Sequence, residues 1–206
     1  MTVGTRSGTK GVARPERELQ ILEAAGRAFG KRGFAATSVA DIAAEAGISK
    51  PLIYNYFGSK EGLFERCLAE ASGLLIGEIE RSAALGAVGV RRALVTLEGV
   101  FAALDGRSWV WAVANDPTAP VVDGAGRLLD SYRRRLEELA TEGVRELLTL
   151  AGDDDALDLE AMTAVWSSVF ASLVAWWCEH PDVSPEQMTA RCERLFGAVF
   201  GSLVSD

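Results

Sequence analysis

Apolar residues recur along this chain at helical spacing, and no segment shows the sustained apolar–polar alternation that indicates a β-strand. The first 65 residues contain three short segments of this kind, separated by glycine and serine. Longer segments follow at about residues 59–79, 90–104, 121–150 and 161–178, with a short one at 108–114, and a last one begins at about residue 184. The pattern predicts an all-α protein with short N-terminal helices followed by a larger set of long helices.

The N-terminal part has the pattern of a helix-turn-helix. Ser38 is placed to cap a helix, and Asp41, three residues later, completes a capping-box pattern. Gly47 can adopt the left-handed conformation that ends a helix, and Ser49 can cap a second helix with Pro51 in its first turn. In DNA-binding proteins of this class the second helix enters the major groove. The alternative interpretation is a small helical bundle that happens to contain a serine-capped turn.

A larger set of residues around this motif matches a known family. The set is Ile21, Leu22, Glu23, Ala24, Ala25, Phe29, Gly33, Phe34, Thr37, Ser38, Val39, Asp41, Ile42, Ala43, Ala46, Gly47, Ile48, Ser49, Lys50, Ile53, Tyr54, Tyr56, Phe57, Ser59, Lys60 and Glu61. In these positions the chain resembles the DNA-binding domain of the TetR family of transcriptional regulators. The resemblance covers about residues 15–65, and beyond them it extends only to length, helicity and general layout.

The resemblance implies a set of DNA contacts. By position, Ser38, Tyr54, Tyr56 and Lys60 correspond to phosphate contacts of the family. The places nearest the bases are occupied by Val39, Ala40, Lys50, Pro51, Leu52 and Asn55, and Ser49 begins the same helix. Because several of these side chains are apolar, we expect contacts with thymine methyl groups and DNA shape to contribute to the sequence preference.

The distribution of charge favours DNA binding at one end of the chain only. The formal net charge is −8. Residues 1–60 hold nine Lys and Arg against five Asp and Glu, a net of +4, so the other 146 residues hold 12 basic and 24 acidic groups, a net of −12. Attraction for phosphate is therefore expected at the N-terminal end. A solvated helix face is the alternative explanation of the basic excess.

Length and composition predict one soluble regulator of two domains. A chain of 206 residues with 49% hydrophobic content can bury a substantial core. We expect a disordered basic arm over residues 1–13, a helix-turn-helix domain over 14–62 and a helical regulatory domain over 63–206. The arm either contacts the minor groove through its basic residues or is only a flexible terminus. It lacks the apolar core of a signal peptide, which predicts a cytoplasmic location.

Residues 161–178 form a run of 18 uncharged residues, the lower length limit of a membrane span. The run contains Thr163 and three serines, its flanks are acidic, and an amphipathic segment follows. A helix that is apolar all round also occurs where one face meets the core and another meets a partner subunit. We therefore expect no membrane contact here.

The last helical segment indicates a homodimer. Its apolar residues form one stripe, and Gly197, Ala198 and Gly201 would allow another helix to approach closely. Two-fold symmetry suits a palindromic double-stranded DNA site, and the TetR resemblance also implies a dimer. The expected interface residues are Trp177, Met188, Cys192, Leu195, Phe196, Val199 and Leu203. The alternative is that the last two helices only close the core of the monomer.

All five tryptophans lie beyond residue 108, where the larger domain is expected to bind a small molecule. Such pockets are largely apolar and aromatic, although aromatic residues at helical spacing also simply pack. The candidate ligand-binding residues are Phe101, Trp109, Trp111, Tyr132, Trp166 and Phe170. The resemblance implies that a ligand there changes the separation of the recognition helices. The expected protein is a repressor released from a palindromic operator by an unidentified small apolar or amphipathic effector.

Side chains that could support catalysis or bind metal are sparse. The chain has one histidine, His180, and its three cysteines, Cys67, Cys178 and Cys192, lie far apart in apolar patterns. This favours buried reduced thiols, with a redox sensor as the alternative. We expect no enzymatic activity, no metal and no cofactor. An enzyme that uses the aromatic cavity is disfavoured by the single histidine, and an architectural DNA binder is disfavoured by the large acidic second domain.

Overall fold

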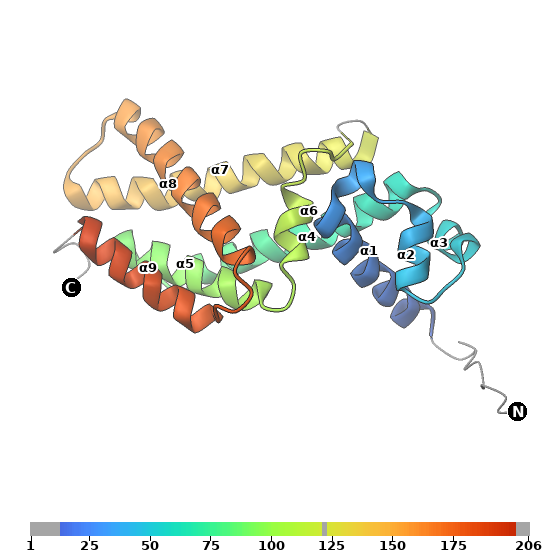
Figure 1. The fold of residues 1–206 in the computed structure, drawn as a ribbon. Coiled ribbons are helices and arrows are strands. Elements are labelled where there is room, and N and C mark those ends of the chain that lie inside the picture. The colour runs from blue at the N-terminus through green and yellow to red at the C-terminus, as the bar shows by residue number, and fades with distance from the viewer. Residues whose placement is uncertain (1–12, 121–122, 201–206) are drawn as a thin grey trace, which may run out of the picture.

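The computed structural model describes residues 13–120 and 123–200 (Figure 1). Over these residues every regular element is an α-helix, which confirms the predicted all-α class. The helices are α1 (Arg14–Ala36), α2 (Val39–Glu45), α3 (Lys50–Phe57), α4 (Lys60–Ala83), α5 (Gly89–Leu104), α6 (Trp109–Ala114), α7 (Asp123–Ala151), α8 (Ala156–Cys178) and α9 (Pro185–Phe200). Nearly all of the expected N-terminal arm, and Leu203 of the expected dimer interface, lie outside the described residues.

The predicted capping chemistry accounts for how α2 begins and ends. The backbone N–H of Asp41 donates to Ser38 Oγ at 3.1 Å, and the N–H of Ser38 donates to Asp41 Oδ2 at 3.2 Å, so the capping box is complete. Gly47 follows the helix with φ of 65°, a conformation that costs little only for glycine.

Ser49 differs from the expectation, because its side chain makes no capping hydrogen bond. The cause lies in the first turn of α3. Pro51 has no N–H to donate, and the N–H of Leu52 donates to the carbonyl oxygen of Ser49 at 3.0 Å. The start of α3 is therefore stabilised by a backbone hydrogen bond and by the fixed φ of proline.

Helices α1 to α3 form one end of the molecule, and α5, α7, α8 and α9 form the other (Figure 1). Helix α4 belongs to both ends, since it packs against α1 and α3 and also against α5 and α7. One connected core runs from Ile21 in α1 to Phe196 in α9. The expected division between residues 62 and 63 therefore falls inside a continuous helix.

The short helix α6 joins the two ends by packing closely on α1. Gly26 and Gly30 of α1 leave room for Trp109, whose indole occupies the space that a side chain at residue 26 would need. The loop after α6 adds polar contacts at the end of α1, where Gly33 kinks the helix. Asp116, which is buried, accepts a hydrogen bond from the N–H of Phe34 at 2.5 Å. The contact between the two ends is thus both apolar and polar.

Helix α8 is the one described helix that is long and apolar enough to cross a membrane by length and composition. Only 17% of its most apolar window is buried, so much of this helix faces outward in the single chain. Its exposed apolar residues include Leu157, Val165 and Trp176. Another protein surface could pack against this exposed apolar face.

Candidate DNA-binding surface and effector cavity

Helix α3 presents most of its expected DNA-contacting residues to solvent. Ile53 is fully buried and anchors the helix, whereas Tyr54 is 41% exposed. Other exposed residues of this surface are Ala40, Ser49, Lys50, Pro51 and Asn55, and Leu52 is half-buried. Val39 is buried in the core, so its side chain is not on the surface that α3 presents. The exposed set extends along one side of α3, from Ser49 to Asn55, and includes Ala40 at the start of α2.

Three cationic groups lie over aromatic rings of this domain. Lys50 Nζ is 5.8 Å from the ring centroid of Tyr54, and Lys60 Nζ is 4.2 Å from that of Phe34. The guanidinium of Arg14 is 5.3 Å from the ring of Tyr56. Such contacts are favourable, and they limit the positions that these long side chains adopt. The expected phosphate-contacting residues Tyr54, Tyr56 and Lys60 are therefore each part of an ordered pair.

Ser38 has a second role beside the expected phosphate contact. Its hydroxyl donates to Asp41 Oδ2 at 2.7 Å while it accepts from the backbone of the same residue. These hydrogen bonds from Ser38, and the nearby charge of Arg32, hold the pKa of the Asp41 carboxyl below its usual value. A phosphate contact by the Ser38 hydroxyl would therefore compete with its hydrogen bond to Asp41 Oδ2, but not with the two backbone N–H donors of the capping box.

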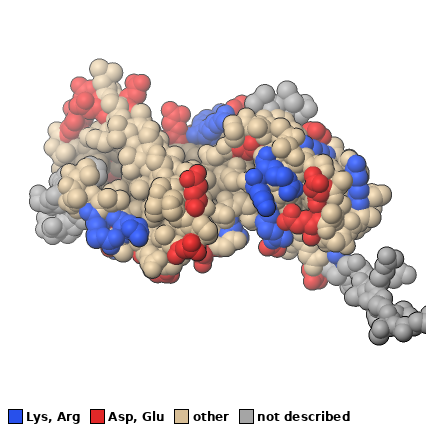
Figure 2. Space-filling model, in the orientation of Figure 1, with Lys and Arg blue, Asp and Glu red and all other residues tan. Residues whose placement is uncertain are grey.

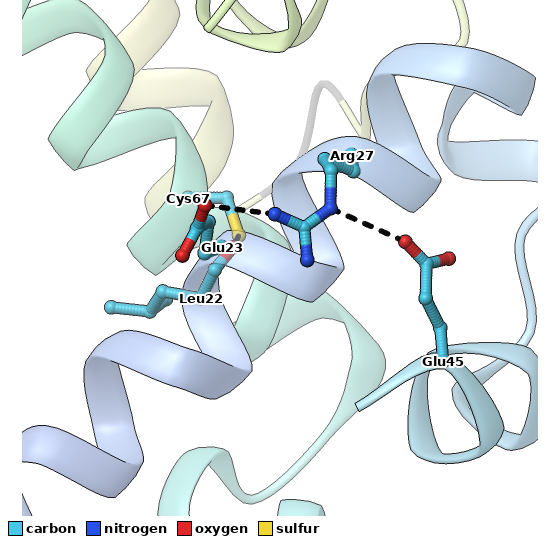
Figure 3. A network of polar contacts seen from close by, with 5 residues as sticks. All are labelled: Leu22, Glu23, Arg27, Glu45 and Cys67. Atoms are coloured by element: carbon cyan, nitrogen blue, oxygen red, sulfur yellow. Dashed lines mark hydrogen bonds and ion pairs between the residues drawn. The ribbon is translucent and has the colours of Figure 1, made fainter. Parts of the chain in front are cut away.

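A basic side chain beside this surface is already neutralised. Arg27 of α1 lies between Glu23, at 2.8 Å, and Glu45 of α2, at 3.4 Å (Figure 3). Figure 3 also shows Cys67 of α4 beneath α1, with its Sγ donating to the carbonyl oxygen of Leu22 at 3.7 Å. The pair Arg27–Glu45 ties α2 to α1 and leaves Arg27 less available to phosphate.

All three cysteines are free, and burial is the main cause that raises their thiol pKa values. The pKa of Cys67 is raised to about 12, and those of Cys178 and Cys192 to about 11. Thiolates are the reactive form, so these thiols are poor nucleophiles at neutral pH. His180 stacks on Trp176 with ring centroids 3.8 Å apart. Among the described residues no group of three His, Cys, Asp or Glu side chains could hold a metal ion.

Charge is unevenly spread over the face in Figure 2. Acidic side chains gather at the end where α7 meets α8, whereas Lys and Arg side chains stand among acidic ones over α1 to α3 (Figure 2). The α7–α8 loop carries Asp153, Asp154 and Asp155. A polyanion would therefore be repelled at the end of the molecule opposite α3.

The larger part of the molecule contains an apolar cavity of about 410 Å³. This volume is within the range of ~300–1,000 Å³ that is usual for small-molecule sites. Helices α4 to α9 all contribute to its wall, which includes Trp111, Trp166 and Phe170. The Phe170 ring centroid is 6.3 Å from that of Trp111 and 6.1 Å from that of Trp166. The structure thus brings together three of the six expected ligand-binding residues.

The other three lie outside the cavity wall. The ring of Phe101 is fully buried, 5.2 Å from that of Trp177. Tyr132 is buried in α7, where desolvation raises its pKa. Trp109 lines a separate, open groove between α1, α6 and α8. These three residues therefore do not line the cavity in this structure.

The few polar side chains on the cavity wall are those of Arg92, Thr96, Asn115 and Ser167. The sequence indicated Asn115 and Ser167 as possible polar groups of a pocket, but not Arg92 or Thr96. Arg92 and Thr96 occupy one face of α5, where the side-chain hydroxyl of Thr96 donates to the carbonyl oxygen of Arg92 at 2.9 Å. An arginine near the start of an amphipathic helix normally indicates a solvated face. In the sequence, the only sign that Arg92 shares a helix face with another polar residue is its place one turn before Thr96.

The expected interface residues divide into two groups. Met188, Cys192 and Phe196 are buried within the chain itself, as is Trp177, whose Nε1 donates to the carbonyl oxygen of Val183 at 2.8 Å. Leu195 and Val199 are 53% and 74% exposed. Next to them, α8 exposes Val165 and Val169, and the rings of Trp166 and Phe196 join the two helices at 6.1 Å. The outward apolar face thus consists of parts of both α8 and α9. It is continuous with the cavity, because Val165, Val169, Leu195 and Val199 also line the cavity wall.

Comparison with known proteins gives the same class as this geometry. Residues 21–67 match the profile of the family described as bacterial regulatory proteins, tetR family. The regulator BetI of Brucella canis is 32% identical over 148 residues, which cover 66% of this chain and 70% of BetI. The regulator TtgR of Pseudomonas putida is 49% identical over 53 residues, which are 26% of this chain and 25% of TtgR. Several relatives with high local identity are matched over only 17–27% of their own length.

The whole fold also has known counterparts. A TetR-like transcriptional regulator from Rhodococcus sp. RHA1 superposes with a TM-score of 0.70 at 23% sequence identity, covering 93% of this chain and all of the other. The fold and the helix-turn-helix define a regulator of the TetR type. The chain belongs to the TetR family of bacterial transcriptional regulators and is not an enzyme.

Proposed function

We propose that this protein is a homodimeric, cytoplasmic transcriptional repressor that binds a palindromic operator and is released from it by a small apolar or amphipathic effector. The main support for the proposal is that α4 and α6 contact both ends of the molecule. Ile79 of α4 and Trp111 of α6 line the cavity. The same two helices pack against α1 of the DNA-binding domain.

Helix α6 supplies a short physical path between the two sites. Trp111 belongs to the cavity wall, and Trp109, two residues earlier, packs on α1 at Gly26 and Gly30. Asp116, just after the helix, accepts a hydrogen bond from the N–H of Phe34 near the C-terminal end of α1. A ligand that moves Trp111 would therefore move the contacts of α1 as well. Such a ligand acts only if it binds the two states unequally, and a tenfold loss of operator affinity needs ~1.4 kcal/mol of coupling.

The outward apolar face on α8 and α9 supports the proposed dimer. Val165, Val169, Leu195 and Val199 lie on it, together with Trp176, which is 42% exposed. Apolar patches of this kind commonly mark protein–protein contacts. A two-fold axis beside these helices would relate two α3 helices, as a palindromic site requires.

DNA binding is tested by selection of duplexes from a random-sequence pool, followed by measurement of affinity against salt concentration. Lys60→Ala should lower the slope of log affinity against log salt by about 0.9, because one phosphate contact is lost. Arg133→Ala is the matched control, since it removes an exposed positive charge on α7. Asn55→Ala should instead change the preferred sequence, at a cost of ~1–3 kcal/mol for a lost base contact. Absence of salt-dependent affinity for any duplex would contradict the proposal.

A further inference from the structure

Among the residues that the structure describes, Arg92 is the one charged residue that lines the cavity. It lies near the start of α5, and its side chain is only 13% exposed. Gly143 of α7 lies against the guanidinium, since a Cβ there would be in ordinary contact, 3.6 Å from Arg92 Nε. Burying a guanidinium in an apolar wall is unfavourable unless its donors are used. Arg92 is therefore unlike every other wall residue and calls for a function.

The hydrogen bonds of Arg92 are only partly satisfied by the described part of the chain. Nη1 donates to Glu146 Oε1 at 2.6 Å, and this pair joins α5 to α7. For Nε and Nη2 no acceptor is found among the described residues. Their edge of the guanidinium is a planar fork of donors, which fits the two oxygens of a carboxylate.

We propose that Arg92 binds the anionic end of the effector, and that this effector is an amphipathic carboxylate with an apolar body. The inference rests on the proposed effector cavity and names the chemistry of its occupant. The carboxylate pairs with the free edge of Arg92 while the body lies against Trp111, Trp166 and Phe170.

An anion fits this wall better than a cation does. Glu146 is not part of the wall, and its Oε1 is already paired with Arg92, whereas its Oε2 is buried with no hydrogen-bond partner among the described residues. A cationic ligand would face the guanidinium with no carboxylate beside it on the wall. A neutral ligand would leave the free donors of Arg92 desolvated, at the cost of unmade charged hydrogen bonds.

The test compares two probes with the same apolar chain, decanoate and 1-decanol, by calorimetry below their aggregation concentrations at pH 7.5. The wild-type protein should bind decanoate about tenfold or more tightly than 1-decanol, the ratio that corresponds to ~1.4 kcal/mol. Arg92→Met should abolish this preference and leave the affinity for 1-decanol equal or higher. Arg91→Met is the matched control, because Arg91 is the exposed neighbour and does not line the cavity.

A second variant keeps the inference testable if Arg92→Met folds poorly. Glu146→Gln removes the charge that competes for Arg92 and should strengthen decanoate binding severalfold without changing the affinity for 1-decanol. The inference is overturned if 1-decanol binds the wild type as tightly as decanoate, if neither probe binds, or if Arg92→Met keeps the preference. These outcomes are independent of operator release. Selective binding of decanoate that leaves DNA affinity unchanged would contradict the effector mechanism of the proposed function but not the assignment of Arg92.

Discussion

Replacement of Gly26 by alanine tests whether the contact between α1 and α6 holds the two ends of the molecule together. Gly26 is a buried residue in the middle of α1. The added Cβ would lie 2.6 Å from Cζ3 and 2.7 Å from Cδ2 of Trp109. Carbon atoms do not approach so closely, and the indole is a rigid ring, so either α6 or the side chain of Trp109 must move.

The expected magnitude follows from two opposing effects. Alanine is favoured over glycine in a helix by ~0.8–1 kcal/mol. Overpacking a filled contact typically costs ~1–3 kcal/mol. Gly73→Ala in α4 serves as the control, because it gains the same helix propensity and its Cβ would meet nothing within 4 Å. The difference between the two variants therefore isolates the overpacking, and Gly26→Ala should be less stable than Gly73→Ala by ~1–3 kcal/mol.

Thermal unfolding of both variants at one protein concentration measures this difference. For a chain of this size, 1 kcal/mol corresponds to a change of roughly 2–4 °C in the midpoint. The same two substitutions are then made together with Trp109→Ala, which removes the ring. In that background the extra cost of Gly26→Ala should disappear. Equal midpoints for Gly26→Ala and Gly73→Ala, or a cost that persists without the ring, would refute the proposed packing.

Two further predictions concern the surfaces of the molecule. Val199→Glu should convert the proposed dimer to monomer in sedimentation, because an unpaired carboxylate in an apolar interface costs several kcal/mol and symmetry applies it twice. Val88→Glu, at a residue that is 52% exposed between α4 and α5, should leave the dimer intact, and a dimeric Val199→Glu protein would place the interface elsewhere. For Asp41, the depressed pKa of the folded state means that its stabilising effect is present above the unfolded value of about 3.8 and is lost as pH falls below it. Asp41→Asn should therefore lower the unfolding midpoint at pH 7 but much less at pH 3; an equal loss at both would contradict the linkage.

The features that could be predicted from the sequence are those that depend on residues a few positions apart. Ser38 and Asp41 form their capping box within one turn of chain, and Ser184 and Gln187 do the same at α9, where the N–H of each donates to the side chain of the other. Such signals survive any tertiary arrangement. Ser49 was the exception, since Pro51 has no N–H to donate and the N–H of Leu52 donates to the carbonyl oxygen of Ser49 instead of to its hydroxyl.

The cavity could not be predicted in this way, because it depends on which side of each helix faces inward. Phe101 and Trp111 are both buried aromatic residues, but only Trp111 is on the cavity wall. The apolar stripe that was predicted on α9 is present. The sequence did not show, however, which of its residues are buried within the same chain. Phe196 packs inside and Val199, almost one turn later, faces outward. Arg92 gave no local signal beyond its place one turn before Thr96, because its position in the cavity wall depends on the helices that surround it.

The continuity of α4 has a consequence for exchanging parts between relatives. No flexible linker separates the DNA-binding end from the other end, because one helix from Lys60 to Ala83 belongs to both. In an α-helix each added residue turns everything beyond it by about 100° and advances it by ~1.5 Å. A chimera joined within α4 must therefore keep the exact residue count, since one inserted residue would turn Leu75 and Ile79 away from their present partners. The operator specificity of one relative and the effector specificity of another can be combined only in helical register.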